Sequence, residues 1–113
     1  MTSKFEYKPE FLYLTTTGRK SGQPREIEIW FVAHEGCYYL CAEHREQTQW
    51  VQNIQQHSAV SFWVEGQVYH GTARIIDPAA QPDIAAPVSA LLDTKYKWSD
   101  GLLVQLCPDS NPA

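Results

Sequence analysis

The chain has 113 residues, enough for one hydrophobic core but too few for two independently stable domains. Hydrophobic residues make up 43% and charged residues 19%, which excludes the low-hydrophobicity, high-charge composition of a disordered chain. Thirteen acidic residues outnumber nine basic ones, and the net charge of −4 argues against long-range attraction to nucleic acid or anionic lipid. We therefore expect one domain, residues 1–113, that binds anions only where cations gather locally.

Targeting and metal signals are also missing from the sequence. No apolar run approaches the ~20 residues of a spanning helix, and the opening MTSKFEYKPEF lacks the apolar stretch of a secretory signal. These features predict a soluble, cytoplasmic protein without a membrane span. The three cysteines are odd in number, and Cys37 and Cys41 would share one face of a strand, so we expect reduced thiols. The four histidines show no metal-ligand spacing, so no metal is expected.

Short segments rich in β-branched and aromatic residues follow one another along the chain, and glycine-containing turns separate several of them. The predicted strands are Phe11–Thr17, Arg25–Val32, Cys37–Ala42, Ala59–Val64, Gln67–Ile76 and Leu102–Leu106. Short links between neighbouring strands imply hairpins and hence an antiparallel sheet. Six strands are enough to roll into a small barrel without long exposed edges. The predicted fold class is therefore mostly β (α+β), with two short helices.

The two predicted helices interrupt this series of strands. In Thr48–His57, Trp50, Val51 and Ile54 fall on one helical face, and Thr48 can act as the N-cap. The second helix is predicted to start near Pro87, because proline suits a first helical position, and to run through Tyr96.

A basic turn, Gly18-Arg19-Lys20-Ser21-Gly22, follows the first predicted strand, and Arg25 begins the second. No acidic residue occurs between Glu10 and Glu26. Glycine-permitted backbone N–H groups, a hydroxyl and cations are the donors that a phosphate requires. The orders G-x-x-x-x-G-K-[ST] and G-x-G-x-x-G are both absent, so the turn is neither a Walker A loop nor a dinucleotide fingerprint. A plain solvated turn has the same composition, so both interpretations stay open at this point.

A wider pattern surrounds the basic turn. The stretch TTTGRKSGQPREIEIWF, the Trp50-x-x-Asn53 motif and the later strand ending GTARII resemble the deazaflavin-dependent nitroreductase family over roughly residues 11–76. The resemblance implies an FMN-binding-like split β-barrel that binds coenzyme F-420, an 8-hydroxy-5-deazaflavin. It also implies a homodimer, and an oxidoreductase that transfers a hydride to a small electrophilic acceptor such as a quinone, enone or nitro compound.

The resemblance further assigns cofactor-binding residues. Those expected to hold the anionic tail are Gly18, Arg19, Lys20, Ser21, Gly22 and Arg25, and those expected near the ring are Trp30, His44, Trp50 and Asn53. His44 lies nearest to the place of a lysine that family members carry beside the cofactor. The proton for the product is left to Tyr96, His44 or water, and no catalytic residue is assigned.

Two alternatives remain open from the sequence. The same fold could use FMN, with the basic turn taking the single terminal phosphate. The chain could also be a non-catalytic module that carries a flavin-like or haem-like ligand.

Overall fold

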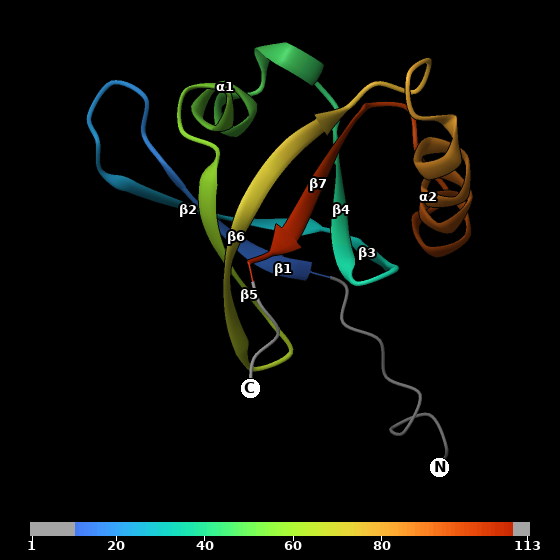
Figure 1. Ribbon diagram of the computed structural model, residues 1–113, viewed down its shortest axis with the longest axis horizontal. Helices are drawn as coiled ribbons and strands as arrows, with labels where there is room; N and C mark the ends of the chain where they lie inside the picture. Colours follow the sequence, from blue (N-terminus) through green and yellow to red (C-terminus); the bar gives the residue numbers. More distant parts are fainter. Residues whose placement is uncertain (1–10, 110–113) are drawn as a thin grey trace.

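The computed structural model describes residues 11–109 and contains one antiparallel sheet, curled upon itself, with two α-helices outside it (Figure 1). The strands are β1 (Phe11–Thr17), β2 (Pro24–Trp30), β3 (Val32–His34), β4 (Cys37–Ala42), β5 (Ala59–Val64), β6 (Gln67–Ile76) and β7 (Leu102–Pro108). Their order across the sheet is β2-β1-β5-β6-β7-β4-β3. Four predicted strands, namely those that became β1, β4, β5 and β6, are confirmed with their predicted bounds.

The strand count is corrected from six to seven because the predicted strand Arg25–Val32 breaks at one residue, Phe31. Before the break β2 pairs with β1, and after it β3 pairs with β4. The strands β2 and β3 are therefore the two edges of the sheet, and one residue joins them. This connection closes the sheet into a barrel with a seam, and the predicted antiparallel barrel is confirmed.

The break at Phe31 leaves a backbone donor and acceptor that the neighbouring strands do not bond. The Phe31 N–H donates to the hydroxyl of Tyr96 at 3.2 Å. The Phe31 carbonyl accepts from the Tyr96 hydroxyl at 3.0 Å and from Lys95 Nζ at 2.9 Å. Both partners lie at the end of helix α2 (Pro82–Tyr96), so this helix satisfies the backbone polar groups that the kink exposes.

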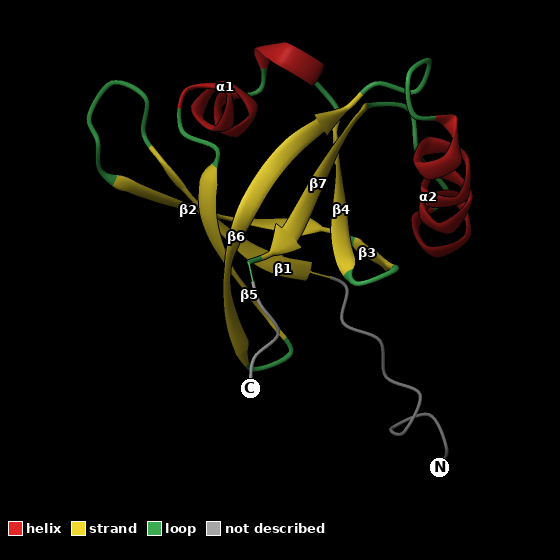
Figure 2. Ribbon diagram, viewed as in Figure 1, coloured by secondary structure: helices red, strands yellow, loops and turns green. Residues whose placement is uncertain are grey.

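Two hydrophobic cores follow from the alternation of side chains along the strands. The barrel interior contains alternate residues of each strand, such as Leu12 and Leu14 of β1 and Phe62 of β5, all essentially without exposed area. The second core lies between the outer face of the sheet and α2, where Val88 and Leu92 pack with Ile76 and other residues. Figure 2 shows α2 beside β3, β4 and β7, so it covers one side of the outer face. No helix of residues 11–109 covers the outer face of β1, β2 and β5.

The first helix, α1 (Gln49–Gln56), confirms the prediction to within one residue at each end. It follows a short 3-10 turn, η2 (Arg45–Gln47), and packs at the end of the barrel next to the β1–β2 turn (Figure 1). Thr48 is its N-cap residue, but the predicted side-chain cap is wrong. The Thr48 side chain makes no capping hydrogen bond, and its buried Oγ1 has no partner among the described residues.

The second helix begins five residues earlier than predicted and is longer than expected. Pro82, not Pro87, occupies the start of α2, and the Gln81 carbonyl accepts from the N–H groups of Ile84 and Ala85 at 3.1 and 3.0 Å. Pro87 lies inside the helix. The prediction failed because several prolines near this helix suit a first turn, and sequence alone does not rank them.

A disulfide between Cys37 and Cys107 corrects the prediction of reduced thiols. The pairing of β4 with β7 ends at Tyr38 opposite Leu106, which brings the next residue of each strand face to face. The two cysteines are 70 residues apart in the chain, so the prediction, which weighed the spacing of Cys37 and Cys41, did not detect them. Cys41 is a free cysteine.

Candidate functional site

The β1–β2 turn is held by its own hydrogen bonds. The Gly18 N–H donates to the Gln23 carbonyl and the Gly22 N–H to the Gly18 carbonyl, both at 2.8 Å. Ser21 Oγ accepts from the Gln23 N–H at 3.1 Å and from Arg25 Nη2 at 3.3 Å. Gly22 has φ of +73°, a conformation that favours glycine. A Cβ at Gly18 would lie 2.7 Å from Ser21 Oγ, so any larger residue there would require the Ser21 side chain to move.

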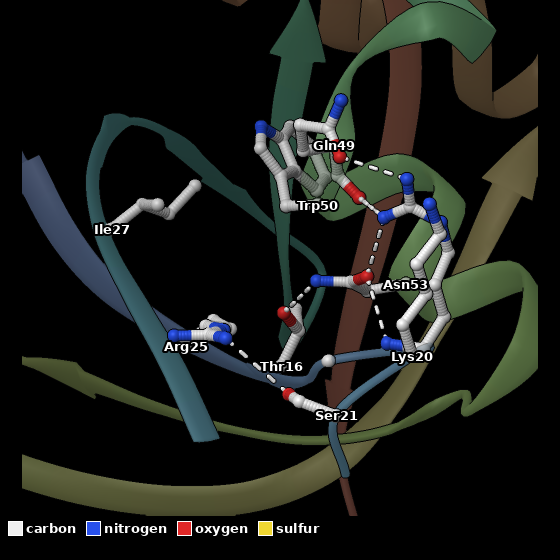
Figure 3. A pocket seen from close by; sticks show the side chains of 10 residues that line it. Thr16, Lys20, Ser21, Arg25, Ile27, Gln49, Trp50 and Asn53 are labelled. Carbon is white, nitrogen blue, oxygen red and sulfur yellow. Dashed lines mark hydrogen bonds between the residues drawn. The ribbon is translucent and has the colours of Figure 1, made fainter. Parts of the chain in front are cut away.

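The turn is also fastened to helix α1, chiefly through Asn53. Asn53 Oδ1 accepts from the backbone N–H of Arg19 at 3.1 Å and from Arg19 Nη1 at 2.9 Å. Asn53 Nδ2 donates to Thr16 Oγ1 at 3.1 Å, and Arg19 Nη2 donates to Gln49 Oε1 at 2.8 Å. Asn53 is only 5% exposed, and its side chain thereby joins the turn, strand β1 and helix α1 (Figure 3). We call this set of bonds the Asn53 clamp.

Between the turn and the helix lies a cavity of about 390 Å³, which we call the basic cleft. It is lined by Thr16, Gly18, Arg19, Lys20, Ser21, Arg25, Ile27, Gln49, Trp50 and Asn53. Three lining residues are cations and none is acidic. Within the described part of the chain, the ion pairs are His34 with Glu35 and Arg45 with Asp100, so none of these three cations is neutralised by a carboxylate. An acidic chain therefore keeps a site of positive potential here.

The structure brings seven of the ten predicted site residues together in this cleft: Gly18, Arg19, Lys20, Ser21, Arg25, Trp50 and Asn53. Three lie elsewhere. Gly22 lines a different pocket with Thr17 and Ser61, His44 is exposed just before η2, and Trp30 lies at the far end of β2.

Sequence reasoning missed Thr16, Ile27 and Gln49 as cleft residues. Strand alternation could have found the first two. Thr16 is opposite Arg25 in the β1–β2 register, and Ile27 is two residues beyond Arg25, so all three share one face. Helical spacing could have found Gln49, which precedes Asn53 by four residues.

Trp30 belongs to a second cavity, of about 450 Å³, which we call the seam cavity. It is lined by Phe11, Glu28, Ile29, Trp30, Cys41, Glu43 and Trp98. The Trp30 ring stacks on Tyr96, with 4.4 Å between ring centroids and 6° between planes. Five residues of strand separate Trp30 from Arg25, which is about 17 Å at the rise of an extended chain. Trp30 and the basic turn therefore occupy opposite ends of β2.

Burial is the main cause of a raised pKa at two groups of the described chain. Burial raises the pKa of the Cys41 thiol to about 11, and burial, with a smaller contribution from the neighbouring Tyr69, raises the pKa of Tyr38 to about 12. Both groups keep their protons at neutral pH, so neither supplies an anionic nucleophile there. Within residues 11–109 no three His, Cys, Asp or Glu side chains gather to hold a metal ion. No helix of that region combines the length and apolarity needed to cross a bilayer.

Comparison with known proteins decides the family. The model of the F420H2-dependent quinone reductase family matches residues 1–97. The chain belongs to this family. The resemblance to deazaflavin-dependent reductases is thereby confirmed, and the family is one of oxidoreductases. No curated protein matches the chain.

Solved structures share the fold of this family member at low sequence identity. A heme storage protein from Vibrio cholerae, HutZ, is 16% identical with a TM-score of 0.74, over 96% of this chain and 88% of that one. An F420-H2 dependent reductase, FDR-A, is 23% identical with a TM-score of 0.61, over 86% and 93% of the two chains. A structure described as a domain-swapped dimer is 21% identical with a TM-score of 0.62, over 88% and 81%. At these identities the likeness shows the fold alone.

Proposed function

We propose that the protein binds reduced coenzyme F-420 and transfers a hydride from it to a small electrophilic acceptor such as a quinone, enone or nitro compound. The observation that carries the proposal is the basic cleft, in which three cations gather without a carboxylate in a member of a deazaflavin-dependent family. When bound, the coenzyme would supply the hydride. The protein would supply binding, orientation and exclusion of water.

The donors of the cleft fit an anionic tail, and they divide into two groups. Arg19 is largely committed to the protein, because its backbone and guanidinium donate to Asn53 and Gln49. Lys20 is exposed and makes no hydrogen bond or ion pair within the described residues. Arg25 donates to a neutral hydroxyl, that of Ser21. We therefore assign Lys20 and Arg25 as the residues that contact the tail, and Arg19 as a positioning residue that holds the turn against α1.

The apolar wall of the cleft suits a flat ring attached to that tail. Ile27 and Trp50 line the cleft, and Trp50 is nearly buried on α1. A ring that covers them would remove apolar surface from water, which adds to the affinity that charge provides. The cleft does not suit haem as well, because none of its lining residues is a histidine, cysteine, methionine or tyrosine that could ligate iron.

Titration of the purified protein with F-420 and with FMN tests the proposal. We expect F-420 to bind more tightly, and we expect Lys20→Ala to weaken its binding about tenfold, since a charge-assisted contact contributes roughly 1.5–3 kcal/mol. Lys97→Ala is the matched control, because Lys97 is exposed and lines neither cavity. Equal affinity of Lys20→Ala and Lys97→Ala for F-420 would show that the turn is an ordinary surface loop that does not contact the cofactor. Tighter binding of FMN than of F-420 would show that the cofactor is a flavin and would contradict the proposal.

We also propose that the protein is a homodimer and that it pairs through the outer face of β1, β2 and β5, which no helix of the described part of the chain covers. Cross-strand pairing aligns Tyr13, Trp63 and Val68 there, and the last two are 42% and 59% exposed. Light scattering after size exclusion measures the mass. Trp63→Lys should convert a dimer to a monomer, whereas a wild-type protein that already runs as a monomer would contradict the proposal.

A further inference from the structure

Strands β3 and β4 form a hairpin whose tip, residues 34–37, extends beyond the ladder that joins β4 to β7. Its turn is Glu35-Gly36, and both turn residues have positive φ, +49° and +85°. Among the described strands β3 pairs only with β4, and the β4–β7 ladder stops at Tyr38. The disulfide between Cys37 and Cys107 continues this connection by one residue. A covalent bond therefore ties the hairpin tip to the end of β7.

The β5–β6 hairpin has the same turn but no such bond. Its turn is Glu65-Gly66, with φ of +52° and +81°, and the glutamate and glycine of both turns are exposed. The β5–β6 hairpin is held by six residue pairs, whereas the β3–β4 hairpin has three. A hairpin with few paired residues opens more readily than one with many. The disulfide is thus located on the hairpin that depends more on an added constraint.

Both sulfurs of this bond lie near the surface. Cys37 and Cys107 are partly exposed, although the five residues that precede Cys107 in β7 are all buried. Cys107 is opposite Thr72 on β6, whose side chain is exposed. Accessible disulfides are the ones that exchange with external thiols. A thiolate from solvent can therefore approach this bond while the barrel stays folded.

The neighbouring strands keep the two cysteines close when the bond breaks. Cys107 remains paired with Thr72 of β6, and β4 keeps its ladder with β7. Cys41 does not compete for either partner, because four residues of strand place it about 13 Å from Cys37. Burial also raises the pKa of Cys41 to about 11, so its thiol is protonated and unreactive at neutral pH. Reoxidation should therefore restore the same pairing.

We infer that the Cys37–Cys107 disulfide is a reversible redox lock. In the oxidised protein it fixes the hairpin tip to β7, and in the reduced protein the tip opens while the barrel remains folded. The reductant is a dithiol, whose first thiolate attacks one sulfur and forms a mixed disulfide. Its second thiolate then releases that sulfur, so the protein gains two electrons and two protons and the dithiol leaves as a disulfide. The redox lock involves no cofactor and does not depend on the proposed function.

The base of the hairpin limits how far the opening extends. Val32 is 5% exposed and packs in the second core against α2. The Phe31 carbonyl accepts hydrogen bonds from Lys95 and Tyr96 at the end of the same helix. These contacts do not involve the disulfide, so they hold β3 in place after reduction. The opening is thus confined to the tip, where it exposes the backbone at Glu35 to proteolysis.

Limited proteolysis with a glutamate-specific protease under native conditions tests the redox lock, with mass spectrometry of the fragments. We expect dithiothreitol to accelerate cleavage after Glu35 about tenfold or more, the effect of a local opening. Cleavage after Glu65 should not change, which makes the second Glu-Gly turn a matched control within the same chain. The double variant Cys37→Ala with Cys107→Ala should be cleaved rapidly after Glu35 with or without dithiothreitol.

Reversal and fold retention complete the test. The reduced protein should keep the circular dichroism spectrum of the oxidised protein, and oxidised glutathione should restore slow cleavage after Glu35. Equal acceleration at Glu35 and Glu65 would show that reduction unfolds the whole barrel and would overturn the inference. Unchanged cleavage after Glu35, once thiol titration shows complete reduction, would overturn it as well. Reduction by dithiothreitol only at urea concentrations that unfold the protein would also contradict it.

Discussion

The Asn53 clamp makes a strong prediction about how the basic cleft keeps its shape. Asn53→Ala removes three hydrogen bonds at a site that is 5% exposed, one of them from the Arg19 guanidinium. Two neutral bonds contribute about 1 kcal/mol each, and a charge-assisted bond contributes roughly 1.5–3 kcal/mol. Alanine has a higher helix propensity than asparagine, which offsets about 0.5 kcal/mol of this loss in the free energy of unfolding. We therefore expect the free energy of unfolding to fall by about 3 kcal/mol.

Urea unfolding followed by tryptophan fluorescence measures this change, and thermal unfolding should show a melting temperature lower by roughly 10–15 °C. Gln55→Ala is the control, because Gln55 is exposed on the same helix. The clamp also predicts that Arg19→Ala and Asn53→Ala are not additive, with a coupling of about 1 kcal/mol or more between them.

The affinity for F-420 should fall in Asn53→Ala as well, because Lys20 and Arg25 would lose their fixed positions. Asn53→Asp keeps the acceptor for Arg19 but loses the donor to Thr16, so it should retain part of the stability. If the free energies of unfolding of Asn53→Ala and Gln55→Ala differ by less than about 0.5 kcal/mol, the Asn53 clamp does not hold the turn and the reasoning is refuted.

The remaining predictions concern the cysteines and a close backbone contact. Thiol titration of protein denatured without a reductant should detect one free thiol, and titration after reduction should detect three. Three free thiols without a reductant would refute the Cys37–Cys107 disulfide. Cys107→Ser should lower the free energy of unfolding by about 4 kcal/mol, the chain-entropy value for a closed loop of this length. The rate of Cys41 alkylation should rise with pH, with a midpoint at the folded pKa of about 11. Because this pKa lies above the unfolded value of 9.0, the free energy of unfolding should fall as the pH rises from 9.0 to about 11. An alkylation midpoint near 9.0 would contradict the burial of this thiol. Gly71→Ala should destabilise the barrel by about 2 kcal/mol or more, since its Cβ would lie 2.2 Å from the Cys107 carbonyl oxygen, and an unchanged melting temperature would contradict that contact.

Much of the local structure could be predicted from the sequence because it depends on near neighbours. The β-branched and aromatic composition of FLYLTTT and AVSFWV is enough to predict β1 and β5, and the spacing of Trp50, Val51 and Ile54 is enough to predict α1. The basic turn could also be located, since its glycines and cations lie within a few residues of each other. These signals act over distances of two to four residues, which a sequence displays directly.

The break at Phe31, the disulfide and the Asn53 clamp were decided by the tertiary structure. The stretch from Arg25 to Val32 has the composition of an unbroken strand. It breaks at Phe31, because closure of the barrel pairs the residues before this point with β1 and those after it with β4. The Tyr96 hydroxyl accepts the hydrogen bond from the Phe31 N–H. Cys107 meets Cys37 only through the register of β4 and β7. The pairing of backbone and side-chain donors across 30 to 70 residues depends on which strands meet, and that choice is made by the burial of the whole barrel rather than by local preference.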